Sequence, residues 1–379
     1  MYYNSILIKE LGAKVSYSIF SSKNGVDELH VIINLLPSTD SFQSQKERIQ
    51  KAENAFISDE EFSDAKIIFK RYFLSDAINQ SPYFTKEKDY ACSIIQQPPL
   101  NSSKISVWIY LVKNVQVQNN NDIFFFKHNN YTHFWDMCML FPNGNSYEQT
   151  TNLLKLYNNK LNELGLNLKD NCIRTWFYVR DVDIQYMPMV KARREFFESV
   201  GMTKESHFIS STGIAGIPYL QDSIIQMGAY AVKGLQEGQI KFIKALSHLN
   251  PTHEYGVTFE RGTSITYGDR RHIIISGTAS INNKGEVVHV NDIVRQTHRM
   301  WENVNALLEE ANASFENVMQ IIVYLRDIAD YNVVKKMFEK KFPNTPYVIT
   351  HAPVCRPNWL IEMECIAIIE SFHSEYEDF

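Results

Sequence analysis

Alternating apolar and polar positions predict several strands along the chain, and the clearest lies near its end. From Leu360 to Ile369, successive side chains fall on two opposite faces, as the period of a strand requires. One face has the composition of a surface that packs against helices, with Ile361, Met363, Cys365 and Ala367. The other face places Glu362 and Glu364 in the middle of an apolar strand. Because burying a carboxylate without partners is costly, we expect this face to meet polar groups from elsewhere in the chain.

A short motif that closes a strand recurs three times and predicts an internal repeat. It has the sequences YFLSD at 72–76, FYVRD at 177–181 and VYLRD at 323–327. Apolar residues at three- and four-residue spacing predict a helix before each copy, over 291–312, over 146–165 with Ser146 as N-cap, and more weakly over 41–56. The predicted order in each repeat is strand, strand, helix, strand, helix, strand, strand. This order is typical of an α+β sandwich with helices on one face of the sheet.

The second face of each predicted sheet is too apolar to remain in water, as HIIISGTASI at 272–281 and FWDMCMLF at 134–141 illustrate. Three such sheets can bury these faces by packing on one another, so we predict a compact pseudo-trimer within one chain. Three independent domains are the alternative, which the lack of a long Gly/Ser or Pro linker disfavours. Polar segments suggest modules at residues 1–115, 116–245 and 246–379.

Composition and charge disfavour several classes of function. The 379 residues carry a net charge of −5 and are 44% apolar, which gives no electrostatic reason to expect nucleic acid binding. No stretch has the roughly 18 apolar residues of a membrane span, and no signal sequence is visible, so we expect a cytoplasmic protein. The five cysteines lack CxxC spacing and the histidines lack metal-ligand spacing, so we expect neither disulfides nor a metal site. We expect the acidic tail 373–379 to be solvated.

Residues 259–369 resemble the YjgF/RidA family. The stretches that carry the resemblance are FERGTSI at 259–265, IIISGTASINNKG at 273–285, VRQTHRMWENVNALLEEA at 294–311, VYLRD at 323–327 and IEMECIAII at 361–369. That family forms homotrimers with small-molecule sites between subunits, so the resemblance implies tandem α/β sandwich modules arranged as such a trimer. Imine-deaminating members carry an Arg on the strand after the second helix. Here no Arg lies between Phe342 and Cys355, and Tyr347 stands at about that position.

A closer likeness is to the chorismatase family, whose chains contain modules of this kind and cleave chorismate. It is carried by RTWFYVRD at 174–181, SSTGIAG at 210–216 and CRPNWLIEME at 355–364. The last stretch places Cys355 seven residues before Glu362, the spacing expected of the catalytic region in that family. The resemblance implies an enzyme that releases pyruvate from chorismate and needs no cofactor.

Cleaving the enolpyruvyl ether of chorismate requires an acid that protonates its terminal carbon and anchors for two carboxylates. We predict Glu362 as the acid, because an apolar strand between two sheets favours its protonated form. Cys355 is a second catalytic candidate, which would shape the ring pocket or steer the product. The candidate substrate-binding residues are Arg174, Ser211, Thr212, Gly213, Arg261, Tyr347 and Arg356. For each of them an ordinary structural role, such as a salt bridge, a turn or a core contact, is the alternative.

Aligning the final strands of the repeats places Gln226 and Ser106 near the position of Glu362. We therefore predict one active site, between the second and third repeats. A RidA-like imine or enamine hydrolase and a non-catalytic carboxylate-binding protein are the alternative functions. We expect a small carboxylate as partner, no nucleic acid or membrane, and a monomeric pseudo-trimer or weak homo-oligomer. The product, a dihydroxycyclohexadiene carboxylate or a 3- or 4-hydroxybenzoate, is left open.

Overall fold

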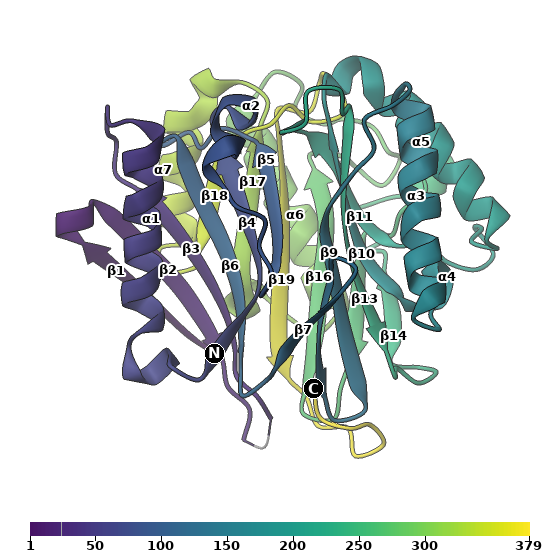
Figure 1. The fold of residues 1–379 in the computed structure, drawn as a ribbon. Coiled ribbons are helices and arrows are strands. Elements are labelled where there is room, and N and C mark those ends of the chain that lie inside the picture. Colours follow the sequence, from purple (N-terminus) through teal and green to yellow (C-terminus); the bar gives the residue numbers. More distant parts are fainter. Residues whose placement is uncertain (24) are drawn as a thin grey trace.

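A computed structural model describes residues 1–23 and 25–379 and arranges them in three sheets with helices on their outer sides (Figure 1). The first sheet has the order β1-β2-β3-β6-β4-β5-β12. Its strands are β1 (Tyr2–Ile8), β2 (Ala13–Phe20), β3 (Glu28–Leu35), β4 (Ala65–Leu74), β5 (Ala91–Gln96), β6 (Ile105–Lys113) and β12 (Ile217–Pro218). Its outer face is covered by α1 (Phe42–Ile57), and the short α2 (Ala77–Gln80) follows β4.

The second and third sheets repeat this plan. The second has the order β11-β10-β13-β9-β8-β7, with β7 (Val117–Asn120), β8 (Ile123–His128), β9 (Tyr131–Leu140), β10 (Cys172–Val179), β11 (Ser210–Ala215) and β13 (Ile225–Lys233). The third has the order β14-β15-β16-β19-β17-β18, with β14 (Ile240–Ile243), β15 (Gly262–Thr266), β16 (Arg270–Ala279), β17 (Val318–Leu325), β18 (Tyr347–His351) and β19 (Ile361–Glu370). Their helices are α3 (Ser146–Glu163), α4 (Leu168–Asn171), α5 (Val182–Ser199), α6 (Ile293–Glu310) and α7 (Tyr331–Lys341).

The repeat predicted from the sequence is present in all three sheets. The strand that carries the motif, β4, β10 or β17, pairs in parallel with the next strand, β5, β11 or β18. The same strand pairs antiparallel with the final strand, β6, β13 or β19. The prediction of tandem α+β sandwich modules is therefore confirmed, and we call them the first, second and third modules.

The predicted helices are present with small shifts at their starts. Ser41 caps α1 by accepting a hydrogen bond from the backbone N of Ser44 at 3.2 Å. The N-cap of α3 is Asn145 rather than the predicted Ser146, because Asn145 and Glu148 form a reciprocal capping box. Asp292 caps α6, whose first residue is Ile293.

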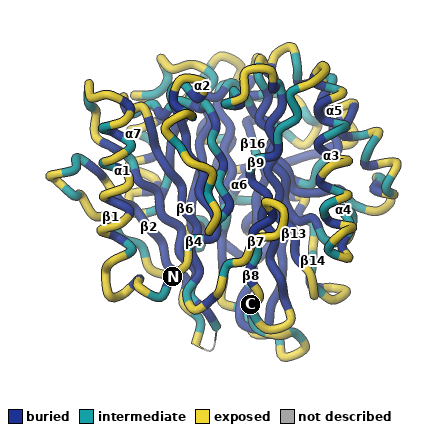
Figure 2. Tube along the Cα trace, viewed as in Figure 1, coloured by how far each residue is buried: buried dark blue, intermediate teal, exposed yellow. Residues whose placement is uncertain are grey.

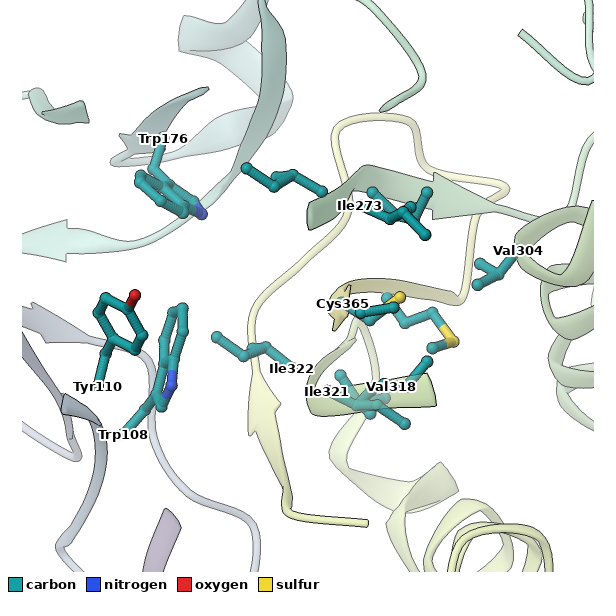
Figure 3. Close-up of a cluster of buried hydrophobic side chains, with 14 of the residues drawn as sticks. Trp108, Tyr110, Trp176, Ile273, Val304, Val318, Ile321, Ile322 and Cys365 are labelled. Atoms are coloured by element: carbon teal, nitrogen blue, oxygen red, sulfur yellow. The ribbon is translucent and has the colours of Figure 1, made fainter. Parts of the chain in front are cut away.

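The inner faces of the three sheets pack on one another as an intramolecular pseudo-trimer. Figure 3 shows Trp108, Trp176 and Ile322 pointing toward one another from three different sheets, and all three side chains are fully buried. Figure 2 shows buried strands at the centre and exposed residues in the loops and on the outer sides of the helices. Mutual burial of the second sheet faces is the physical reason for the pseudo-trimer, as the apolar strands predict.

The tail 373–379 is only partly solvated, because its last residue is inserted between the modules. Phe379 is 1% exposed, and its ring centroid lies 4.7 Å from that of His133 and 4.6 Å from that of His272. Its backbone N donates to Oδ1 of Asp269 at 2.9 Å. The expectation of a solvated tail is wrong for Phe379, since aromatic partners from two modules bury it.

The module boundaries predicted at 115/116 and 245/246 stay predictions, and two strands are informative about them. Strand β14 lies before residue 246 but pairs with β15 of the third sheet. Strand β12 follows β11 in the chain but pairs with β5 of the first sheet. Within the described chain, none of the helices combines the length and apolar character needed to cross a membrane.

Candidate active site

A cleft forms where β11 of the second module meets β16 and β19 of the third, and we call it the 2–3 cleft. Two cross-module hydrogen bonds fix the strands: the backbone N of Ser211 donates to Oγ of Ser276 at 2.9 Å, and the backbone N of Gly277 donates to Oγ1 of Thr212 at 2.9 Å. The cleft is lined by Tyr186, Arg193, Ser211, Thr212, Gly213, Val257, Phe259, Arg261, Gly277, Ala279, Ile281, Cys355, Arg356, Trp359 and Glu362.

Glu362 lies in this cleft as a buried carboxyl group. On β19 it pairs with Tyr324 on one side and Ala279 on the other, and it is 4% exposed. Burial, and next to it the negative charge of Glu364, raise the pKa of Glu362 to about 8. Glu362 is therefore mostly protonated at neutral pH and can donate a proton. This is the protonation state predicted from its place on an apolar strand.

Gly277 makes room for that carboxyl group. A Cβ atom at residue 277 would lie 2.1 Å from Oε1 of Glu362 and 3.0 Å from Cγ2 of Thr212. Real side chains do not approach so closely, so any larger residue at this position would displace Glu362. The absence of a side chain at residue 277 leaves the space that the carboxyl group of Glu362 occupies.

Glu364 points to the same side of β19 but is surrounded by cations and hydrogen-bond donors. Its Oε2 accepts from Nη2 of Arg174 at 2.7 Å, and its Oε1 accepts from Nη1 of Arg71 at 3.2 Å and from Nε1 of Trp176 at 2.9 Å. Burial alone would raise the pKa of Glu364, but Arg174, Arg71 and these hydrogen bonds hold it below its usual value. Glu364 is therefore the charged partner of a neutral Glu362, and it joins residues of all three modules.

Arg193, Arg261 and Arg356 contribute guanidinium groups to the wall of the cleft. Arg193 is 1% exposed and donates from Nη1 to Oγ of Ser211 at 3.4 Å. Arg261 is 4% exposed and donates from Nη2 to the backbone O of Asn250 at 3.2 Å. The guanidinium of Arg356 lies over the ring of Trp359, 5.5 Å from its centroid. With Glu362 protonated, the charge facing the cleft is positive, which favours an anionic ligand.

Cys355 lies in the same wall as a neutral thiol. Burial, and after it the neighbouring Glu362, raise the pKa of Cys355 to about 12. A thiol with such a pKa is a poor nucleophile at neutral pH. Among the side chains that the structure describes, no group of three or more His, Cys, Asp or Glu residues is placed to hold a metal ion.

Seven of the nine residues predicted from the sequence meet in this cleft: Ser211, Thr212, Gly213, Arg261, Cys355, Arg356 and Glu362. Arg174 and Tyr347 do not line it. Arg174 binds the protein's own Glu364 and also donates from Nη1 to Oγ of Ser276 at 3.1 Å. Its prediction as a substrate clamp is corrected, because the carboxylate it clamps belongs to the chain.

Tyr347 lies between the third and first modules. Its strand β18 borders the first module, and the backbone O of Tyr347 accepts from Nδ2 of Asn34 at 3.2 Å. It lines a different cavity, together with Lys14, Asn34 and Glu339. Tyr347 pairs with Ile321 of β17, and Ser211 pairs with Thr175 of β10. Ile321 and Thr175 occupy equivalent positions in the repeat, each three residues before the Tyr of its motif. Tyr347 is therefore the counterpart of Ser211 at another module contact, which explains why it does not reach Glu362.

Tyr186, Arg193, Trp359 and Gly277 are cleft residues that the sequence prediction missed. A usable signal existed for Arg193. On α5 the buried positions Tyr186, Val190, Arg193 and Phe197 follow helical spacing, so the arginine falls within an apolar stripe. A charged residue at such a position requires a polar neighbour, which only another element could supply.

The repeat-based comparison of positions is confirmed by strand register. Glu362 pairs with Tyr324 of the VYLRD motif, Gln226 pairs with Tyr178 of FYVRD, and Ser106 pairs with Phe73 of YFLSD. These pairs are equivalent in the three modules. The acid is therefore present at this position in the third module alone.

The cleft is narrow. The open space that it encloses is only about 30 Å³.

Comparisons with known proteins place these features in a family context. The family described as Endoribonuclease L-PSP matches residues 264–369. A RutC family protein of Pyrococcus abyssi is 37% identical over 101 residues, which cover 26% of this chain and 79% of that protein. The 3-aminoacrylate deaminase RutC of Acinetobacter baylyi is 29% identical over 98 residues, which cover 25% of this chain and 77% of that protein.

A solved structure is similar over almost the whole chain. The crystal structure of a chorismatase superposes with a TM-score of 0.66 and covers 92% of this chain and 99% of its own. At 15% sequence identity, this likeness shows a shared fold, which extends through all three modules.

Proposed function

This chain belongs to the RutC family through its third module, and from that premise we propose that it is an enzyme that cleaves the enolpyruvyl ether of chorismate and releases pyruvate. The observation that carries the proposal is a protonated, buried Glu362 in a cleft walled by Arg193, Arg261 and Arg356. The chorismatase-like fold of the whole chain supports it.

The arginines suit the two carboxylates of chorismate. A guanidinium group binds a carboxylate through paired hydrogen bonds, and such charge-assisted bonds are strong where water is excluded. Arg261 and Arg193 are almost fully buried, whereas Arg356 is partly exposed near the loop that contains Cys355. We assign carboxylate binding to these arginines and ring contacts to Tyr186 and Trp359.

Glu362 acts as the general acid in this scheme. It transfers its proton to the terminal methylene carbon of the enol ether, and the positive charge develops at the neighbouring ether carbon. A water molecule adds to that carbon, the bond from this carbon to the ring oxygen breaks, and pyruvate and a ring alcohol leave. One proton of this water restores Glu362, and the other passes to the ring oxygen as its bond to the carbon breaks. A positioned acid of this kind contributes about 10²–10⁴ in rate.

The test is incubation of the protein with chorismate and measurement of pyruvate. The wild type is expected to release pyruvate. Glu362→Gln is expected to fold but to release pyruvate at least about 10²-fold more slowly, because an amide cannot donate the proton. Absence of pyruvate release by the wild type contradicts the proposal. Chromatography of the ring product then distinguishes a dihydroxycyclohexadiene carboxylate from a hydroxybenzoate.

A second candidate is hydrolysis of an enamine or imine that carries a carboxylate. The similarity to the 3-aminoacrylate deaminase favours it, because protonating an enamine carbon also requires an acid at the position of Glu362. The lack of an Arg between Phe342 and Cys355 disfavours it. Ammonia release from an enamine generated in the assay, without pyruvate release from chorismate, would select this function. A carboxylate that raises the melting temperature but is not converted would instead indicate a binding protein.

A further inference from the structure

We propose that Arg326 and Asp183 are positioning residues that hold the two walls of the 2–3 cleft together and so set its affinity for the substrate. The proposal rests on the proposed function for its kinetic test but also has a structural test of its own. One wall of the cleft is α5 of the second module. The other is the segment 352–360 of the third module, which contains Cys355 and Arg356.

Arg326 fixes the 352–360 segment. It follows β17 directly, and its backbone N donates to the backbone O of Leu360 at 3.0 Å. Its Nη2 donates to the backbone O of Val354 at 2.8 Å. The two ends of the segment are therefore bound by one residue, and Cys355 and Arg356 lie between these points.

The same guanidinium reaches across the module boundary to α5. Nη1 of Arg326 donates to Oδ2 of Asp183 at 3.0 Å, and Nη2 donates to Oδ1 at 2.5 Å. This paired geometry fixes orientation as well as distance. Asp183 lies in the first turn of α5, one turn before Tyr186 and on the same helix as Arg193. The carboxylate is also favoured there by the helix dipole.

The pair lies at the rim of the cleft and not in its core. The side chain of Arg326 is 17% exposed and that of Asp183 is 49% exposed. Ion pairs this accessible contribute little to global stability. Loss of the pair should therefore alter the placement of the two walls without unfolding the protein.

The repeat supplies a matched control at the same motif position. Arg180 of FYVRD is the counterpart of Arg326 of VYLRD. Arg180 donates from Nη2 to the backbone O of Leu220, at 3.5 Å, within its own module. Replacing Arg180 removes an arginine of the same motif without touching the 2–3 cleft.

The kinetic test compares Arg326→Gln, Asp183→Asn and Arg180→Gln in the chorismate assay. Because misplacing binding groups by about 1 Å can cost up to about a hundredfold, we expect KM to rise about ten- to hundredfold in the first two variants while kcat changes less. Arg326→Lys, which keeps the charge, should restore part of the affinity. The double variant should resemble Arg326→Gln, because that variant has already lost the ion pair that Asp183→Asn removes. Arg180→Gln should leave KM unchanged.

The structural test is amide hydrogen exchange on the intact protein. In Arg326→Gln and Asp183→Asn, exchange should accelerate in 352–360 and in the first turns of α5 and stay unchanged elsewhere. Unchanged exchange in both segments, or faster exchange throughout the protein, overturns the positioning role. Localised exchange in a protein that does not convert chorismate supports the positioning role and contradicts only the proposed function.

Discussion

The 2–3 cleft and the contact between the first and second modules are built from equivalent strands but differ in chemistry. At the contact between the first and second modules, Gln226 occupies the position equivalent to Glu362, and Ser93 occupies the position equivalent to Thr212. Nε2 of Gln226 donates to Oγ of Ser93 at 3.1 Å. One module contact thus uses an amide to bind its neighbour, and the other retains a carboxyl group that can give up a proton.

The two module contacts also differ in the room beside this position and in the helix that covers it. In strand register, Ile94 is the counterpart of Gly213 and Cys138 is the counterpart of Gly277. The helix that covers the 2–3 cleft, α5, has 18 residues, whereas its counterpart α2 has four. An enclosed acid therefore requires more than a Glu at one position. It also requires glycines beside the acid and a long helix over it.

The largest effect on activity should come from giving the 2–3 cleft a residue of the contact between the first and second modules. Gly277→Cys gives the 2–3 cleft the residue found at Cys138, and its Cβ would collide with Oε1 of Glu362. We expect pyruvate release to fall by about 10²–10⁴, as for loss of the acid itself. Cys138→Gly is the matched control and should leave turnover within a factor of a few. Full activity in Gly277→Cys would show that the placement of Glu362 is not limiting.

Removing the charge of Glu364, which pairs with Arg71 and Arg174, should mainly lower the stability of the fold. Glu364→Gln leaves Arg71 and Arg174 buried without their carboxylate, which typically costs about 3–5 kcal/mol of unfolding free energy, measured by urea denaturation. Because the charge of Glu364 helps to raise the pKa of Glu362, the variant should also lose activity at lower pH than the wild type does. Glu53→Gln, which disrupts the buried Lys70 pair within the first module, should destabilise without this change in the pH profile.

The pH dependence tests the protonation state directly. The acid must be protonated, so kcat/KM should fall about tenfold per pH unit above the pKa of Glu362, which is about 8. Because this pKa is raised from 4.5, the folded protein binds more protons than the unfolded chain between these values, and stability from this group declines as pH rises through that window. As pH rises from 5 to 8.5, the urea midpoint of Glu362→Gln should therefore increase relative to that of the wild type. A constant difference would contradict the assigned pKa.

Cys355 should give the smallest effect. Its thiol remains protonated because burial raises its pKa to about 12, so it does not act as a nucleophile. We expect Cys355→Ala to change kcat less than about tenfold and to alter mainly the ratio of ring products. A loss as large as that of Glu362→Gln would assign Cys355 a direct chemical role.

Much of the fold follows from local pattern. The motif FYVRD and its two relatives, the apolar helix stripes and the two-faced sheets predict three modules, because strand and helix periods are properties of neighbouring residues. The position of Glu362 was predictable for the same reason: it lies on an apolar strand, and its counterparts Gln226 and Ser106 can be found by alignment alone. Arg174 was misassigned because a sequence does not show which carboxylate an arginine meets.

The sequence by itself determined the repeated modules, the buried strand face and the place of Glu362 on it. Only the tertiary structure decided that Glu364 takes Arg71 and Arg174 and leaves Glu362 protonated, that Tyr347 belongs to another module contact, and that Arg193 and Gly277 complete the cleft. The physical reason is that charge pairing and close approach join residues distant in the chain, such as Arg71 with Glu364 and Gly277 with Glu362, which meet when the three sheets bury their faces.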